Sequence, residues 1–140
     1  MFELHSQLQN DCEILGQFDL SLVLLNRDAN YPWCILVPMQ QDLTELHHLA
    51  IEDRQQFMAE SCRLAETMVD VFNPIKMNVA ALGNMVPQLH IHHIARFKED
   101  AAWPGPVWGV TPRKPYSDEH LEEVAHRIVA SLTGEGFMAR

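Results

Sequence analysis

Apolar residues between positions 51 and 72 recur every three or four residues, which is the spacing of an amphipathic helix. Glu52 and Asp53 suit the positive N-terminal end of such a helix, and Asn73-Pro74 stops it. We therefore predict a helix over 51–72 and expect its Met-rich stripe to pack on a sheet as core rather than to form a binding surface. The expected stripe consists of Ile51, Phe57, Met58, Cys62, Ala65, Met68, Val69 and Phe72.

Strand-like runs of apolar residues precede this helix at 12–18, 20–25 and 33–38. The turn between the last two, at 26–32, is rich in Asn, Asp and Pro, the residues that supply turn geometry. Three short strands with tight connections indicate an antiparallel meander. A short helical turn is expected before them, at 3–10.

Two further strands are expected after the helix, at 75–82 and 88–97, joined by a turn. A last helix over 117–132 has one apolar face and starts at Ser117, which is suited to be its N-cap. Five strands and two substantial helices, with short turns between neighbouring strands, indicate an α+β fold. We expect a five-stranded antiparallel sheet with the long helix packed on it and a C-terminal helix added.

The composition narrows the class of protein and of partner. The 140 residues fit a single domain, and 47% hydrophobic with 21% charged residues is typical of a globular chain. A net charge of −9 argues against binding to nucleic acid or to an anionic membrane, because such binding needs clustered Lys and Arg. Neither a signal-peptide pattern nor a membrane-length apolar stretch is evident. We expect a cytoplasmic protein whose three cysteines are reduced and mostly buried.

Histidines are concentrated in the last predicted strand. Because side chains alternate along a strand, Gln88, His90 and His92 project to one face. Two imidazoles and an amide on one strand face are costly to bury unless they bond to something, so this face is a candidate site. The residues expected on the opposite face are Leu89, Ile91 and His93.

Three explanations of this polar face stay open on spacing alone. A neutral imidazole can attack phosphorus while a second one donates to the phosphate or to the leaving oxygen. A His-x-His pair on a strand can instead hold a metal ion, because neutral imidazole is a common ligand. An exposed strand can also carry polar side chains by chance.

The residues around the histidines resemble the signature of the histidine triad (HIT) superfamily. That signature reads Gly-Gln, three residues, and then His-φ-His-φ-His-φ-φ, where φ is apolar. The spacing is complete in this chain, whereas the residue types match in part. Gly83 stands for the Gly, Asn84 for the Gln and Gln88 for the first His, and His90 and His92 match the middle and last His.

The resemblance covers residues 12–97 and leaves 98–140 as a C-terminal extension of the single domain, 1–140. Asn26 falls near the place where the family contacts the ribose hydroxyls, with Asp28 as the alternative counterpart. Asn78 lies where the family has an Asn on the strand before the phosphate loop.

Several expectations follow from the resemblance. It implies a homodimer that joins the two sheets, with the long helix at the interface. It also implies hydrolysis or transfer at the α-phosphate of a purine nucleotide or dinucleotide, such as a dinucleoside polyphosphate or a nucleoside phosphoramidate. His90 would form a nucleotidyl-histidine, His92 would bond to the phosphate and leaving group, and Asn78 with Asn84 would contact phosphates. No redox cofactor or protein-bound metal is implied, and Mg²⁺ on a polyphosphate substrate is compatible.

Departures from the family pattern leave other hypotheses about function open. Gln88 can donate and accept hydrogen bonds and so support its neighbours, but it cannot carry a positive charge. Asn84 is one methylene shorter than Gln, and Met85 replaces a hydroxyl residue that some members have near the leaving group. Because His90 is retained, we favour an active enzyme. The alternatives are a nucleotide-binding or interaction module with little or no activity, and a metal-dependent protein.

Other aromatic and basic residues are weaker candidates. Trp103 and Trp108 suit either stacking on a base or packing on their own domain or on a dimer partner, and we favour packing. Arg96, near the end of the histidine strand, suits a phosphate contact or an end-of-strand salt bridge equally. His47 and His48 are expected to be solvated.

Overall fold

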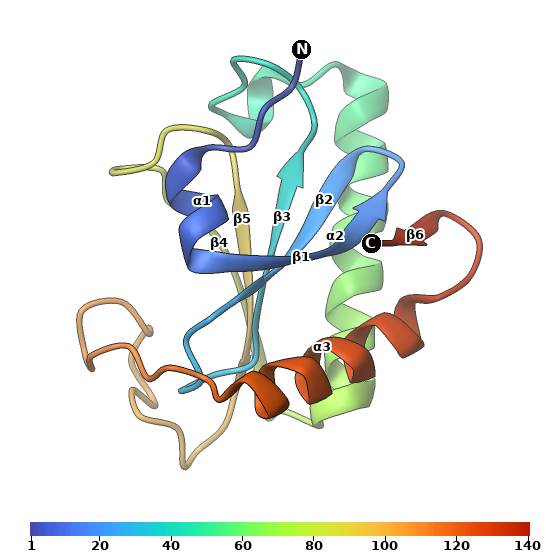
Figure 1. Ribbon diagram of the computed structural model, residues 1–140. Helices are drawn as coiled ribbons and strands as arrows, with labels where there is room; N and C mark the ends of the chain where they lie inside the picture. Colours follow the sequence, from blue (N-terminus) through green and yellow to red (C-terminus); the bar gives the residue numbers. More distant parts are fainter.

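The computed structural model describes residues 1–140 as one antiparallel sheet with helices and loops on both faces (Figure 1). Helix α2 covers one face together with the C-terminal helix, and the N-terminal segment lies on the other. Along the chain the elements are α1 (Ser6–Asp11), β1 (Cys12–Phe18), β2 (Ser21–Asn26), β3 (Trp33–Pro38), η1 (Leu46–His48), α2 (Ile51–Phe72), β4 (Lys76–Ala81), β5 (Ile91–Arg96), α3 (Asp118–Leu132) and β6 (Phe137–Ala139).

The sheet has the order β4-β5-β3-β2-β1-β6, and every neighbouring pair is antiparallel. The predicted meander of β1, β2 and β3 is confirmed, as is the α+β class. The expectation of five strands is wrong by one, because β6 pairs with β1 opposite Gly16. A Cβ at Gly16 would collide with the carbonyl of Met138, so the glycine permits this close approach. A strand of three residues is too short to show a periodicity in the sequence.

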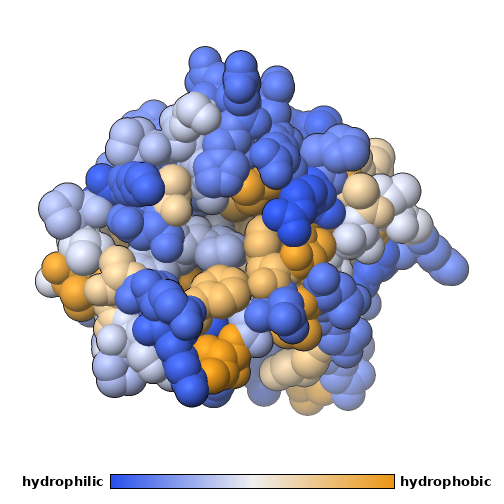
Figure 2. Space-filling view, turned by 90° about the horizontal axis from the view of Figure 1, so that it is seen from below, coloured by the Kyte–Doolittle hydropathy of each residue, from blue (hydrophilic) through white to orange (hydrophobic).

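Two hydrophobic clusters lie on the two faces of the sheet. The larger one joins α2 and α3 to the sheet through residues such as Leu64 and Ile128. The other lies under the N-terminal segment and the loop at 97–116, and includes Leu8 and Val107. The surface seen from below in Figure 2 is mainly hydrophilic, with a smaller group of apolar side chains at its centre.

Helix α2 has the predicted bounds, but only part of the expected apolar stripe is buried. Its buried residues include Phe57, Leu64 and Met68, whereas Met58 is 59% exposed and Val69 is 43% exposed. The helix carries two apolar stripes, and the buried one is completed by polar residues that find partners. Glu60, for example, accepts from the backbone N–H of Leu20 at 2.8 Å. Periodicity alone cannot reveal such a partner.

The ends of the elements follow local chemistry. Asn73 adopts a left-handed conformation with φ of 51° and donates its N–H to the carbonyl of Val69, which ends α2. The predicted N-cap Ser117 accepts from the N–H of His120 at 3.1 Å and starts α3. No helix is both long and apolar enough to cross a membrane.

The histidine strand is shorter than predicted. The ladder of β5 begins at Ile91, and residues 88–90 lie outside it. The N–H of Leu89 donates to the carbonyl of Leu43 at 2.8 Å, so this stretch is bonded to the segment after β3 instead of to β4. As a result, His90 lies at the boundary between the sheet and a loop.

Candidate active site

His90 and His92 lie together on one face of the sheet. Their ring centroids are 5.0 Å apart, and each residue is only 7% exposed. His92 is inside the ladder, opposite Ile35 of β3 and Ala80 of β4, whereas His90 immediately precedes β5. The two rings therefore lie side by side on one face, as the sequence predicts, although His90 lies just outside the strand.

The hydrogen bond at His90 fixes where its proton lies. His90 Nδ1 is 2.7 Å from the backbone carbonyl oxygen of Gln88. A carbonyl oxygen only accepts, so Nδ1 carries the hydrogen and Nε2 of the neutral ring keeps a free lone pair. This is the form of imidazole that can act as a nucleophile.

His92 has the opposite tautomer. The indole Nε1–H of Trp33 donates to His92 Nδ1 at 3.0 Å, so the hydrogen of the neutral ring lies on Nε2. Burial, together with repulsion from His90 and His93, lowers the pKa of His92 to about 3. His92 is therefore neutral at physiological pH and carries its N–H at Nε2.

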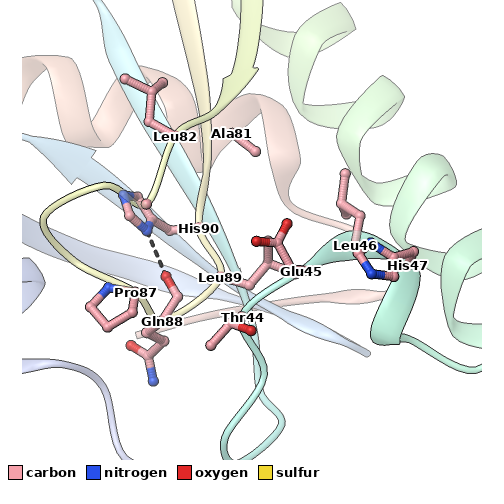
Figure 3. A pocket seen from close by; sticks show the side chains of 11 residues that line it. Thr44, Glu45, Leu46, His47, Ala81, Leu82, Pro87, Gln88, Leu89 and His90 are labelled. Atoms are coloured by element: carbon pink, nitrogen blue, oxygen red, sulfur yellow. Dashed lines mark hydrogen bonds between the residues drawn. The ribbon is translucent and has the colours of Figure 1, made fainter.

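A cavity of about 200 Å³ opens beside His90. Figure 3 shows His90 on one side of it and Glu45 and His47, from the segment before α2, on the other. His47 and His48 are both exposed, as expected, yet His47 is also a wall of this cavity. No motif in the sequence marks Thr44 or Glu45, and His47 is expected there only as a solvated residue. Their segment lies at the site beside the hydrogen bond between Leu89 and Leu43, which are far apart in the chain.

Gln88 does not support the histidines with its side chain, contrary to the expectation. Its Oε1 accepts from the backbone N–H of His5 at 2.8 Å, and its Nε2 donates to the carbonyl of Glu3 at 2.9 Å. Only the backbone carbonyl of Gln88 contacts His90. The amide therefore holds the N-terminal segment beside the site.

Asn26 and Asp28, the candidates for ribose binding, hold a C-terminal segment. Asn26 Oδ1 accepts from the N–H of Asp28 at 3.0 Å and from Arg113 at 3.4 Å. Asp28 Oδ1 accepts from the N–H of Lys114 at 3.2 Å and from Asn30. Both are buried, and the amide nitrogen of Asn26 makes no hydrogen bond within the chain.

The remaining candidates for phosphate binding differ in whether their polar groups are already hydrogen-bonded within the chain. Asn78 pairs with Ile94, two residues along the ladder from His92, and its Oδ1 accepts from Arg96 at 2.7 Å. Gly83 has φ of 85°, in the left-handed region that favours glycine, and lines the cavity. Asn84 is exposed, and its side chain makes no hydrogen bond within the chain, so it is free to meet a ligand.

Arg96 belongs to a structural network, and its guanidinium donates to groups within the chain. It is 1% exposed and forms a salt bridge with Asp100 at 2.8 Å. Its Nη2 donates to the carbonyl of Gly105 at 2.7 Å, and its guanidinium lies 5.7 Å from the ring centroid of Trp103. Of the two alternatives for Arg96, the salt bridge is confirmed. Trp103 packs within its own domain, against the Arg96 guanidinium.

Trp108 lies in the site as well. Its ring centroid is 5.1 Å from that of His92 and 5.9 Å from that of Trp33, with edge-on geometry in both pairs. The half-buried Trp108 therefore packs on its own domain and at the same time forms a wall next to the catalytic candidates.

His93 lies on the opposite face and is fully buried under α2. Its Nδ1 donates to the carbonyl of Ile91 at 3.1 Å, and its Nε2 accepts from Ser61 Oγ at 2.7 Å. Burial lowers its pKa to about 4, against the opposing effect of the Ile91 carbonyl. No three side chains of the His, Cys, Asp or Glu type are grouped as a metal ion needs, here or elsewhere in the chain.

The comparison with known proteins adds the decisive observation. The model of the HIT domain family matches residues 7–99, which is about two thirds of the chain. The chain belongs to the histidine triad family. Members of this family bind nucleotides or act as nucleotide hydrolases or transferases, and the matched region contains both His90 and His92.

Solved structures of histidine triad proteins agree with this assignment. One from Bradyrhizobium japonicum has a TM-score of 0.91 and 40% identity, over 93% of this chain and 97% of that chain. Another from Marinobacter aquaeolei VT8 has a TM-score of 0.91 and 48% identity, over 94% of this chain and 96% of that chain. A hypothetical histidine triad nucleotide-binding protein from Sulfolobus tokodaii strain7, at 17% identity, TM-score 0.63 and coverage of 86% and 83%, shares the fold alone. No curated protein matches the sequence.

Proposed function

We propose that this histidine triad protein is a nucleotide hydrolase or transferase that acts at the α-phosphate through a nucleotidyl intermediate on His90. The observation that carries the proposal is the pair of opposite tautomers. His90 presents a lone pair at Nε2, and His92, whose ring centroid is 5.0 Å away, presents a hydrogen at Nε2. This arrangement suits attack on a phosphate: one ring can attack phosphorus, and the N–H of the other can stabilise the negative charge on the phosphate oxygens.

The reaction would proceed in two displacements. The Nε2 lone pair of His90 forms a bond to the α-phosphorus, and the bond from phosphorus to the leaving group breaks with its electron pair on that group. The positive charge that develops on the His90 ring is stabilised because Nδ1–H is bonded to the Gln88 carbonyl. Water, or a hydroxyl acceptor in a transferase, then forms a bond to phosphorus and releases its proton to the solvent, while the P–N bond breaks with its electron pair returning to His90 Nε2. In both steps His92 would keep its hydrogen and donate a hydrogen bond from Nε2–H to a phosphate oxygen.

Substrate positioning follows from which groups keep free donors. Gly83 and Asn84 lie in the loop that leads to the histidines, and the Asn84 amide is free for a phosphate. We assign ribose contacts to the unbonded amide nitrogen of Asn26, with Asp28 in support through its bond to Lys114. Asn78 would reach a phosphate only with its amide nitrogen, because its oxygen is bonded to Arg96. Dinucleoside polyphosphates and nucleoside phosphoramidates are the substrate classes proposed.

We also propose that the protein is a homodimer with α2 at the interface. The unburied stripe of α2 includes Ile51, Met58 and Val69, all exposed and apolar. Val79 of the edge strand β4 is 51% exposed and pairs with His93, which bonds to Ser61 of α2, so Val79 lies on the face of the sheet that α2 covers. Exposed apolar surface over neighbouring elements, next to an unpaired strand edge, is typical of an interface.

The experiment that tests the catalytic proposal compares the wild type with His90→Ala. Each protein is incubated with diadenosine triphosphate and with adenosine 5′-phosphoramidate, and released AMP is measured by chromatography. We expect His90→Ala to lose turnover by at least about 10³-fold while it still binds AMP. His126→Ala, at an exposed position of α3, is the matched control and should keep activity. Equal hydrolysis by His90→Ala would refute the proposed role of His90.

A second candidate function is a nucleotide-binding module without catalysis. The observation in its favour is that the Gln88 side chain is bonded to the N-terminal segment and lends nothing to the histidine rings. Binding of AMP by the wild type without release of product from either substrate would support this module over the enzyme.

A further inference from the structure

Trp33 has a fixed place in the site. It begins β3, is buried, and packs edge-on against Tyr31, with ring centroids 6.2 Å apart, as well as against Trp108. From this position its Nε1 lies 3.0 Å from His92 Nδ1. The bond is enclosed, so water does not compete for either atom.

The direction of this hydrogen bond limits what His92 can do. An indole N–H only donates, so the Nδ1 lone pair of His92 is occupied. A second proton at Nδ1 would make two N–H groups face each other inside the protein, and no carboxylate bonds to His92 to offset that cost. The neighbouring titratable groups are His90 beside the ring and His93 behind the strand, and neither supplies a negative charge. His92 can therefore donate a hydrogen bond, but it cannot take up an extra proton and pass it to a leaving group.

Leaving groups differ in whether they need such a proton. When a phosphoric anhydride is cleaved, the electron pair of the broken P–O bond departs on a phosphate oxygen, which is a stable anion. When a P–N bond is cleaved, the electron pair departs on nitrogen, and an amine leaves only when that nitrogen has received a proton. A neutral His92 can stabilise the first leaving group with Nε2–H but cannot protonate the second.

We propose that Trp33 is a positioning residue that holds His92 as a fixed neutral Nε2–H donor, and that it thereby selects substrates joined through P–O–P over those joined through P–N. This inference rests on the proposed function, which it narrows to one substrate class. In the favoured reaction the bond from His90 Nε2 to the α-phosphorus forms, the P–O bond to the next phosphate breaks, and His92 keeps its hydrogen.

The test replaces Trp33 by β-(3-benzothienyl)alanine, which substitutes sulfur for the indole N–H and keeps the shape of the ring. The same replacement at Trp108, which contacts the His92 ring without a hydrogen bond, is the matched control for the tautomer. The first readout is the His92 tautomer from ¹⁵N NMR at neutral pH, which requires no turnover. The second is the ratio of kcat/KM for diadenosine triphosphate to that for adenosine 5′-phosphoramidate.

We expect the wild type and the Trp108 control to show hydrogen on His92 Nε2 only, and the Trp33 analogue to show a mixture of both tautomers. We expect the wild type to favour the anhydride by about tenfold or more, and the Trp33 analogue to lose most of this preference, most clearly below neutral pH. Hydrogen on His92 Nδ1 in the wild type, a preference for the phosphoramidate, or an unchanged ratio in the analogue would each overturn the inference. Absence of turnover on both substrates would instead refute the proposed function, and the selectivity with it.

Discussion

Ser61 Oγ and His93 Nε2 lie 2.7 Å apart and join helix α2 to the back of the histidine strand. His93 takes a position that is normally apolar in the family pattern, and it is fully buried. The hydroxyl satisfies the ring nitrogen that would otherwise be buried without a partner. The strand that carries His92 toward the site is thus tied to the helix on its other face by one polar pair.

The two buried histidines, His92 and His93, predict a loss of stability in acid. The folded pKa values of His92 and His93 are about 3 and about 4, below the 6.5 of an exposed histidine. The unfolded chain therefore binds more protons below pH 6.5, and the free energy of unfolding falls as pH decreases from 6.5 toward 4. The full effect is about 1.4 kcal/mol per pH unit for each histidine. Urea denaturation at several pH values measures this slope.

A paired variant shows how much of the slope comes from His93. The double substitution His93→Leu with Ser61→Ala removes the ring and its hydroxyl partner together, and should about halve the slope between pH 6 and 4.5. His126→Gln, at an exposed site on α3, is the control and should keep the wild-type slope. A double variant with the wild-type slope would show that His93 is not buried in its neutral form.

Substitution of Gln88 is expected to affect stability more than catalysis. Gln88→Ala removes two hydrogen bonds to the backbone of Glu3 and His5, at a cost of about 1–2 kcal/mol in stability. The backbone carbonyl that bonds to His90 remains, so kcat should fall by less than about tenfold. Hydrogen exchange measures the release of the N-terminal segment, with the amide of His5 as the reporter. A kcat as low as that of His90→Ala would show that the side chain takes part in the chemistry.

The exposed stripe of α2 predicts the behaviour of the proposed dimer. Met58→Glu places a charge in the stripe and should weaken the dimer by at least about tenfold, as measured by sedimentation. Ala59→Glu adds the same charge at the next exposed position, outside the stripe, and should leave the dimer intact. Identical sedimentation of both variants and the wild type would contradict an interface on α2.

Thiol labelling gives an independent view of the same surface. Cys62 is exposed within the stripe, whereas Cys12 and Cys34 are buried. Burial raises the pKa of Cys12 to about 12 and that of Cys34 further still, so neither forms a reactive thiolate at neutral pH. Labelling should therefore occur at Cys62 alone and become slower as the protein concentration rises.

Periodicity and spacing predicted the parts of this molecule that depend on local sequence. The bounds of α2 and the pairing of β1, β2 and β3 follow from apolar spacing and turn residues, and the histidine pair follows from strand alternation. The choice between the two stripes of α2 could not be predicted, because it depends on partners for Glu60 and Ser61 that are distant in the chain.

The chemistry of the site was also only partly visible in the sequence. The motif indicates which histidines matter, but not which nitrogen of each ring carries the hydrogen. That property depends on Trp33, 59 residues from His92, and on a backbone carbonyl. The cavity wall formed by Glu45 and His47 depends likewise on a contact between segments far apart in the chain.

The most direct measurement of the proposed mechanism is capture of the intermediate. The protein is mixed with diadenosine triphosphate, quenched within one turnover in alkaline denaturant, because P–N bonds to histidine break in acid, and digested for mass spectrometry. We predict that the peptide with His90 carries the added mass of one adenylyl group, with the group on the His90 ring and no adduct in His90→Ala. Release of AMP with no adduct, or an adduct at another residue such as His47, would contradict nucleophilic attack by His90.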